Sequence, residues 1–302
     1  MKINDNEWFE LQFSPEEALK KYGIVLPTLP SDNVQVHFTG LCGRANLEQA
    51  FSFYRYVSSA CRTNHISEPR ILDFGGGWGR VSRFFLRDTK PECIYIAETR
   101  EYAIECLRAT GDRCHIIHNQ PRPPIAGLTE QFDLAFAYSV FSHLSEEYFH
   151  AWINYLLGVL RPGGYLAFTT RGQFFINHLQ HLHRDKDKPH QILEEHVRRL
   201  REEMPLPAEI RRRYLKGDFQ FYPIGGSGEL TSDFFGEAFI PRRYIEQHFR
   251  PFFVDFNEDV SNVDQSVVIL QKPRSQLRAV SGRIRRIKHF FGHFIGDSTV
   301  NQ

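Results

Sequence analysis

The chain has almost no excess of charge of either sign. Its 37 lysines and arginines stand against 36 aspartates and glutamates in 302 residues. Such a balance creates no overall field that would draw nucleic acid or acidic substrates to the protein. No nucleic-acid partner is therefore expected, unless a local basic patch provides one.

Long apolar runs and patterned cysteines are also missing. No apolar run reaches the roughly 20 residues of a membrane-spanning helix, and the first residues lack the charged-then-apolar pattern of a secretion signal. Five cysteines are scattered without Cys-x-x-Cys spacing, namely Cys42, Cys61, Cys93, Cys106 and Cys114. They indicate reduced thiols, not a disulfide framework or a metal site. We expect a cytoplasmic protein without a bound metal.

The glycine-rich segment near residue 75 lacks the Gly-x-Gly-x-x-Gly spacing of a dinucleotide site. From Gly75 that spacing needs glycine at position 80, which is Arg80. The segment instead reads Ile71-Leu-Asp-Phe-Gly-Gly-Gly-Trp-Gly-Arg80: an apolar strand ending in Asp73, a glycine turn, and a run compatible with a helix. Glycines let the backbone approach a ligand and adopt positive φ. This pattern predicts a nucleoside-cofactor site; a glycine turn without a ligand is the plain alternative.

Further apolar runs, each ending in a polar residue, predict the next strands of a parallel sheet. Residues 93–97 end in Glu98, about 20 residues past the glycine turn, where a carboxylate can accept both ribose hydroxyls. A solvated acid at a strand end is the alternative. Residues 115–118 are followed by Asn119, which can donate and accept hydrogen bonds. It precedes a proline-rich turn that could equally be a plain loop.

The second half of the sheet follows the same pattern. Residues 132–138 predict a buried strand that leads into Ser139-Val-Phe-Ser-His-Leu144. Ser145 is a suitable N-cap for a helix that stops at Arg161-Pro-Gly-Gly164. Residues 165–170 predict the fifth strand, and residues 252–256 and 266–270 the closing pair.

In order and spacing, these motifs resemble class I S-adenosylmethionine-dependent methyltransferases. The resemblance implies an α/β, Rossmann-like seven-stranded sheet with a final antiparallel strand pair, and S-adenosyl-L-methionine as the cofactor. It assigns cofactor binding to Asp73, Phe74, Gly75, Gly77, Gly79, Glu98, Thr99, Asn119 and Tyr138.

Methyl transfer requires mainly in-line placement of the acceptor, and an alcohol acceptor also has to lose a proton. His143 follows the fourth strand and can titrate near neutrality, so it is the first candidate for the base. Its alternative role is to cap the helix or fix the loop. Tyr138 is expected to contact the methyl donor or shape the pocket. Weaker candidates are Asp233, Glu237, His37 and Tyr222.

Three regions are expected around these motifs. Residues 1–70 form an N-terminal extension over the sheet edge and cofactor site, and residues 71–272 form the methyltransferase domain. Residues 171–242 interrupt the sheet as a substrate lid with aromatic and glycine-rich loops. Residues 273–302 form a basic amphipathic tail, whose residues 277–295 are candidates for peripheral contact with the inner face of a membrane or with a protein. A helix docked on the domain and a frayed tail are the alternatives.

More narrowly, the sequence resembles methyltransferases that accompany glycosyltransferases in surface-polysaccharide biosynthesis. The residues that carry this resemblance are Tyr138-Ser-Val-Phe-Ser-His-Leu144, Leu160-Arg-Pro-Gly-Gly164 and Phe168-Thr-Thr-Arg-Gly172. It implies a small polar acceptor, a hydroxyl of a sugar or glycan precursor. Two alternatives are N- or O-methylation of a natural product and a non-catalytic cofactor-binding partner of a biosynthetic assembly.

Overall fold

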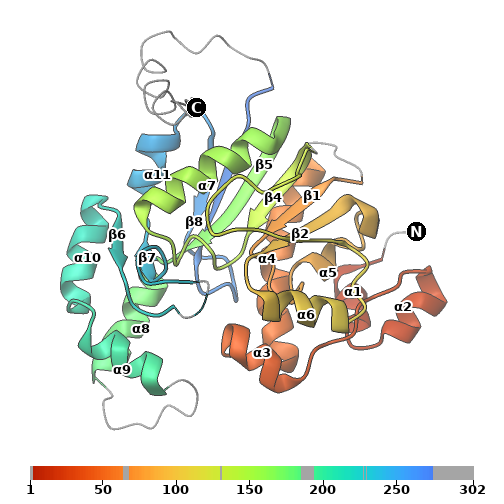
Figure 1. The fold of residues 1–302 in the computed structure, drawn as a ribbon, viewed down its shortest axis with the longest axis horizontal. Helices are drawn as coiled ribbons and strands as arrows, with labels where there is room; N and C mark the ends of the chain where they lie inside the picture. Colours follow the sequence, from red (N-terminus) through yellow and green to blue (C-terminus); the bar gives the residue numbers. More distant parts are fainter. Residues whose placement is uncertain are drawn as a thin grey trace, which may run out of the picture.

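A seven-stranded sheet forms the centre of this computed structural model (Figure 1). The structure describes residues 3–63, 68–129, 131–184, 194–226, 228 and 230–274. The strands are β1 (Ile71–Phe74), β2 (Ile94–Glu98), β3 (His115–His118), β4 (Phe132–Ala137), β5 (Leu160–Thr170), β8 (Phe253–Asn257) and β9 (Ser266–Gln271). Their order is β3-β2-β1-β4-β5-β9-β8. Neighbours from β3 to β5 are parallel, whereas β9 is antiparallel to both β5 and β8. This order confirms the predicted class I methyltransferase fold.

Helices cover both faces of the sheet, because its inner strands carry apolar side chains on both sides. Ile71 of β1 belongs to one buried cluster and its neighbour Leu72 to the other. The first cluster includes side chains of α4 (Gly43–Thr63), α5 (Ser82–Phe85) and α6 (Glu101–Ala109). The second includes side chains of α7 (Glu146–Val159) and α11 (Arg242–Phe249). Burial on both faces explains why the strands appear in the sequence as unbroken apolar runs.

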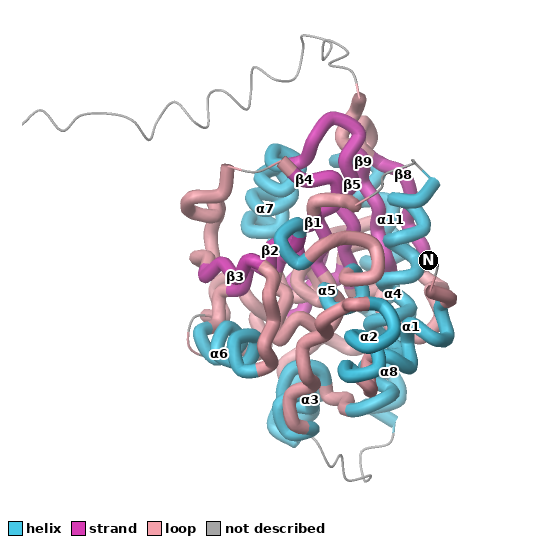
Figure 2. Tube along the Cα trace, turned by 90° about the vertical axis from the view of Figure 1, so that its right-hand side faces the viewer, coloured by secondary structure: helices cyan, strands magenta, loops and turns pink. Residues whose placement is uncertain are grey.

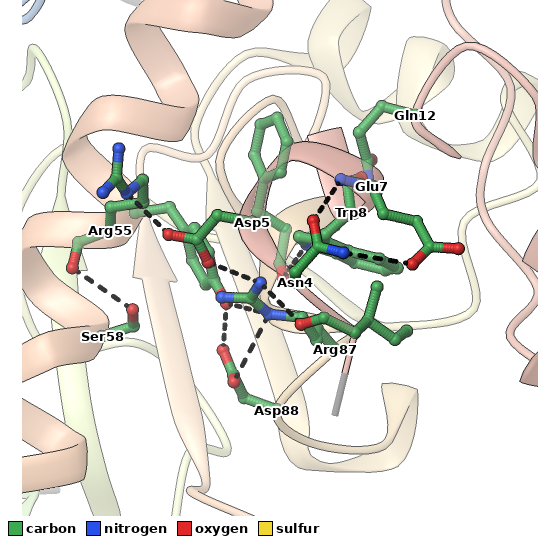
Figure 3. Close-up of polar contacts among 12 residues, drawn as sticks. Asn4, Asp5, Glu7, Trp8, Gln12, Arg55, Ser58, Arg87 and Asp88 are labelled. Carbon is green, nitrogen blue, oxygen red and sulfur yellow. Dashed lines mark hydrogen bonds and ion pairs between the residues drawn. The ribbon is translucent and has the colours of Figure 1, made fainter. Parts of the chain in front are cut away.

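The N-terminal extension is tied to the chain that follows the glycine turn. It begins with α1 (Asp5–Leu11), α2 (Pro15–Tyr22) and α3 (Asp32–Thr39). Trp8 is fully buried, and its Nε1 donates to the carbonyl of Phe84 at 3.0 Å. Beside it, Nη1 of Arg87 lies 2.8 Å from Oδ1 of Asp5 (Figure 3). The first helix is therefore part of the packing around α5.

The extension also reaches the carboxyl ends of β1 and β2. Both views place α3 and α6 at the same end of the molecule (Figure 1 and Figure 2). There the rings of Phe38 and Tyr102 stack with centroids 5.9 Å apart. This contact places an aromatic side chain of the extension beside the glycine turn.

The segment between β5 and α11 adds helices and a two-stranded sheet beside the main sheet. It contains α8 (Gln173–Arg184), α9 (Glu194–Glu202), α10 (Pro207–Lys216), β6 (Gln220–Tyr222) and β7 (Glu237–Phe239). Figure 1 shows these elements grouped at one side of the sheet. They share a separate apolar cluster that includes Ile176, Leu200, Ile210 and Phe239. We call this unit, residues 171–242, the insertion.

The run that follows the glycine turn contains the four-residue helix α5. One local expectation, the N-cap at Ser145, needs correction in part. Ser145 occupies the N-cap position of α7, but its side chain makes no capping hydrogen bond; its backbone carbonyl accepts from the amide of Phe149.

Among the residues that the structure describes, no helix is both long and apolar enough to cross a bilayer. Cys42, Cys93, Cys106 and Cys114 are free thiols, and Cys61 lies outside the described side chains. The tail expected over residues 277–295 lies outside the described residues.

Candidate functional site

One cavity lies at the carboxyl ends of β1, β2 and β4, and residues of α3 and the insertion complete its wall. Eight of the expected site residues line it: Asp73, Phe74, Gly75, Gly77, Glu98, Thr99, Tyr138 and His143. The same cavity therefore joins the glycine turn to the loop that carries the candidate base.

The glycine turn requires residues without side chains at two points on the cavity wall. Gly75 has a φ of +71°, and a Cβ there would lie 2.5 Å from Cγ2 of Val140. Gly77 has a φ of +59°, with the ring of Phe38 as its nearest neighbour. Positive φ strains residues with a Cβ. The turn thus has both the conformation and the close approach expected of a ligand-binding loop.

Glu98 is buried at the base of this cavity and accepts hydrogen bonds from several amides. Its Oε2 accepts from the amide of Gly77 at 2.9 Å, and its Oε1 from the amides of Thr99 and Arg100, each at 3.0 Å. The Arg100 side chain adds an ion pair at 3.2 Å. These contacts fix the carboxylate at the end of β2.

Asp73 is buried at the end of β1 and accepts a 2.5 Å hydrogen bond from Oγ of Ser82. Burial away from water disfavours its charged form and raises the pKa of Asp73 to about 7, although the Ser82 hydrogen bond opposes this rise. Ser82 begins α5, so this bond ties the strand to the helix across the turn.

Two expected cofactor residues do not line the cavity. A Cβ on Gly79 would meet Leu107 of α6 at 3.0 Å, so this glycine allows the turn to pack against α6. The side-chain amide of Asn119 donates to Oγ1 of Thr99 at 3.2 Å, and within the described ranges its Oδ1 has no hydrogen-bond partner. Asn119 supports Thr99, which does line the cavity.

Tyr138 lines the cavity with its hydroxyl already engaged. The hydroxyl donates to the carbonyl of Val263 at 2.9 Å, and the guanidinium of Arg80 lies 4.7 Å from the ring centroid. Burial raises the pKa of Tyr138 to about 12, so the phenol keeps its proton at neutral pH. The geometry suits a wall residue rather than a base.

His143 lies between the sheet and the insertion. Its Nδ1 is 2.7 Å from the carbonyl of Gly236 and 3.7 Å from Oε1 of Glu237. The ring stacks on Phe235, with centroids 5.0 Å apart. Glu237 is buried and pairs with Nε of Arg171 at 2.9 Å. Glu237 thus contacts the expected base without lining the cavity.

The other weak candidates lie off the cavity wall. His37 packs edge-on against Phe38 and Tyr102, Asp233 accepts from Thr231, and the hydroxyl of Tyr222 donates to Gln220. The sequence analysis did not assign Phe38, Arg80 and Arg100 to the site, although they line the cavity. Arg80 ends the glycine-rich segment and Arg100 lies two residues after Glu98, and this nearness in sequence was their only signal. Leu230, Phe234 and Phe235 also line the cavity, and they belong to the segment expected to form the substrate lid.

The comparisons with known proteins agree with this geometry. Residues 72–166 match the family described as a methyltransferase domain. A search of curated proteins returns no match. The residues that match this family contribute strands to the sheet that has the strand order of the class I methyltransferase fold, and they include the glycine turn and Glu98.

The structural likenesses are distant. An S-adenosylmethionine-dependent methyltransferase from Clostridium acetobutylicum ATCC 824 has a TM-score of 0.50 and 11% identity, over 74% of this chain and 91% of that one. The plantazolicin methyltransferase BpumL has a TM-score of 0.47 and 13% identity, over 89% of this chain and 98% of that one. The Burkholderia thailandensis 1,6-didemethyltoxoflavin-N1-methyltransferase has a TM-score of 0.44 and 14% identity, over 73% of this chain and 78% of that one.

Proposed function

We propose that this protein, an S-adenosylmethionine-dependent methyltransferase, methylates a hydroxyl group of a small polar acceptor, a sugar or glycan precursor. One observation carries the proposal: Glu98, the glycine turn and His143 line the same cavity. A cofactor side and an acceptor side with a titratable group are thereby joined.

The residues at the glycine turn suit S-adenosylmethionine. The Glu98 carboxylate would accept the ribose hydroxyls, and the turn at Gly75 and Gly77 would allow close approach of the methionine part. Trp78 also lines the cavity, and its buried Nε1 has no hydrogen-bond partner among the described residues. A buried donor of this kind favours a polar ligand beside it.

The cofactor, when bound, supplies a methyl group made electrophilic by its sulfonium. The chain would orient the acceptor and remove its proton. Because a carbonyl only accepts, the 2.7 Å contact with Gly236 requires the proton on Nδ1 of His143. That tautomer keeps a lone pair on Nε2, which would accept the hydroxyl proton of the acceptor.

The acceptor wall comes from the insertion, which we propose is the substrate lid. Leu230, Phe234 and Phe235 line the cavity, and Phe234 is held by a stacked contact with Tyr148 at 4.6 Å. Flat aromatic faces suit the C–H face of a sugar ring, while His143 offers a polar contact to a hydroxyl. The association with polysaccharide biosynthesis and a cytoplasmic location belong to this proposal.

Calorimetric titration with S-adenosylmethionine and S-adenosylhomocysteine tests the cofactor side. We expect micromolar binding in the wild type and its loss in Asp73→Ala and Glu98→Ala. Labelled methyl transfer to panels of nucleotide sugars, amines and natural-product scaffolds then tests the acceptor. Label in a sugar hydroxyl supports the proposal, whereas transfer only to an amine or scaffold replaces the acceptor class. Binding without transfer to any panel favours a non-catalytic partner.

A further inference from the structure

We infer that Glu237, paired with Arg171, is a positioning residue for His143: its carboxylate lies beside the imidazole and stabilises the cation that forms when His143 takes a proton. This inference deepens the proposed function and rests on His143 as its base. Glu237 belongs to the insertion, 94 residues after His143, so the insertion supplies part of the proton-transfer apparatus as well as the acceptor wall.

Backbone pairing places Glu237 beside the histidine. Leu144 and Phe235 form an antiparallel bridge, the amide of Gly236 donates to the carbonyl of His143 at 2.8 Å, and the amide of Ala238 donates to the carbonyl of Ser142 at 2.8 Å. The start of β7 therefore runs as an extra strand along the loop after β4. This register is set by backbone atoms and does not depend on the charge of either side chain.

The second side of β7 is equally constrained. Arg171 pairs with Phe239 in a parallel bridge, and a Cβ on Gly236 would lie 2.1 Å from the carbonyl oxygen of Tyr222. A glycine is thus needed where the end of β6 lies against this residue. The carbonyl of Gly236 accepts the hydrogen bond from Nδ1 of His143. The insertion orients the imidazole through this carbonyl and places the carboxylate next to it.

The charges complete the arrangement. Glu237 is 1% exposed, and its carboxylate binds Arg171 through Nε at 2.9 Å and Nη2 at 3.5 Å. The guanidinium lies 3.9 Å from the ring centroid of Phe175, which holds it in place. A buried carboxylate kept ionised by an arginine, 3.7 Å from an imidazole, favours the imidazolium form.

Other ionisable groups share the surroundings of His143. On the cavity wall these are Asp73, Arg80, Glu98, Arg100 and Tyr138, and on adjoining segments they are Asp233, Glu146 and Glu147. All of them stay in place when Glu237 alone is changed. A comparison of Glu237 variants with the wild type therefore isolates the effect of this one carboxylate.

The test is an NMR pH titration of the full chain labelled with ¹⁵N-histidine, which needs neither cofactor nor acceptor. The His143 signals are those absent from His143→Asn. In the wild type we expect the tautomer with the proton on Nδ1, and in Glu237→Gln a titration midpoint lower by about one pH unit. Glu246→Gln is the matched control, because Glu246 pairs with Arg242 on the exposed face of α11; its midpoint should equal that of the wild type.

An unchanged His143 midpoint in Glu237→Gln overturns the inference. If loss of the carboxylate leaves Arg171 unpaired and the variant fails to fold, Arg171→Met/Glu237→Gln removes both charges together. We expect the midpoint in that double variant to fall as well, by less, because a cation leaves with the anion. An unchanged or raised midpoint there overturns the inference in the same way.

Activity then separates the inference from the proposed function. Methyl transfer by the wild type and its loss in His143→Ala support His143 as the base. Glu237→Gln should then show a lower kcat and an unchanged KM for S-adenosylmethionine. The acidic limb of its pH–rate profile should move to lower pH. Full turnover by His143→Ala between about pH 6 and 9 refutes the base itself. Loss of activity in Glu237→Gln with no movement of the limb assigns Glu237 a structural role only.

Discussion

The guanidinium of Arg100 contacts both carboxylate oxygens of Glu98, with Nε 3.2 Å from Oε1 and Nη2 3.4 Å from Oε2. It also lies 4.7 Å from the ring centroid of Phe38. These are the oxygens proposed to accept the ribose hydroxyls. In the proposed function, Arg100 and the cofactor would compete for the same acceptor atoms, and the arginine would turn aside when the cofactor binds.

Replacement of Arg100 by alanine should tighten cofactor binding. Removal of one such hydrogen-bonded contact lowers the cost of binding by about 1 kcal/mol, or roughly fivefold in Kd. Calorimetry with S-adenosylhomocysteine measures the change. Arg108→Ala is the control, because Arg108 pairs with Glu101 at 3.7 Å on the exposed side of α6. Weaker binding by Arg100→Ala would mean that the arginine itself contacts the cofactor.

Replacement of Asp73 by asparagine should change how stability depends on pH. Burial raises the folded pKa of Asp73 to about 7 from an ordinary value of 3.8. Between these values the folded protein keeps a proton that the unfolded chain releases, so the free energy of unfolding falls as pH rises. The asparagine variant lacks this titration.

Urea unfolding at several pH values measures the difference. Relative to the wild type, Asp73→Asn should gain of the order of 4 kcal/mol between about pH 4 and pH 8, and the amide oxygen can still accept from Ser82. Parallel stability profiles of the two proteins over this range would show that Asp73 ionises normally in the folded state.

Two glycine-to-alanine changes should shift stability in opposite directions. In Gly236→Ala the new Cβ would lie 2.1 Å from the backbone oxygen of Tyr222, so the β6–β7 pair must move at a cost of at least about 1–3 kcal/mol. Gly158 lies near the end of α7, where a new methyl group would have no neighbouring atom within 4 Å, and alanine there should stabilise by about 0.5–1 kcal/mol. Thermal unfolding measures both. A Gly236→Ala protein as stable as the wild type would refute the close packing of the insertion.

Trp8 should be essential to the packing of the N-terminal extension. Trp8→Ala removes a fully buried indole and should cost about 3–5 kcal/mol of unfolding free energy. Trp8→Phe keeps an aromatic ring but loses the hydrogen bond to the carbonyl of Phe84, and should cost markedly less. Denaturant unfolding of the two variants separates ring from hydrogen bond. Equal stability of Trp8→Ala and the wild type would contradict the docked extension.

The strands were predictable because parallel strands buried on both faces leave an unbroken apolar record in the sequence. The buried strand β1 begins at Ile71 as its apolar run does, and it extends one residue past the expected end at Asp73, to Phe74. The four-residue length of α5 had no such signal, because the run compatible with a helix continues to Leu86.

The cofactor side of the cavity was easier to predict than the acceptor side. Gly75 and Glu98 lie at fixed positions after successive strands, and topology alone brings strand ends together. Glu237 was only a weaker candidate, because its place beside His143 depends on how the insertion folds back and not on a strand end. Gly79 matched the spacing of the cofactor motif and does not line the cavity; a Cβ there would meet Leu107, and its role toward the cofactor stays a prediction.

The position of β7 between the loop after β4 and Arg171 at the end of β5 has a consequence for the evolution of the acceptor specificity. A chimera that receives the insertion of another methyltransferase exchanges the aromatic wall, the Gly236 carbonyl and the Glu237 carboxylate in a single step. In the proposed function, the partner of the histidine is then inherited together with the substrate preference. Lineages that change their acceptor by exchanging this module would carry a matched environment for proton transfer with it.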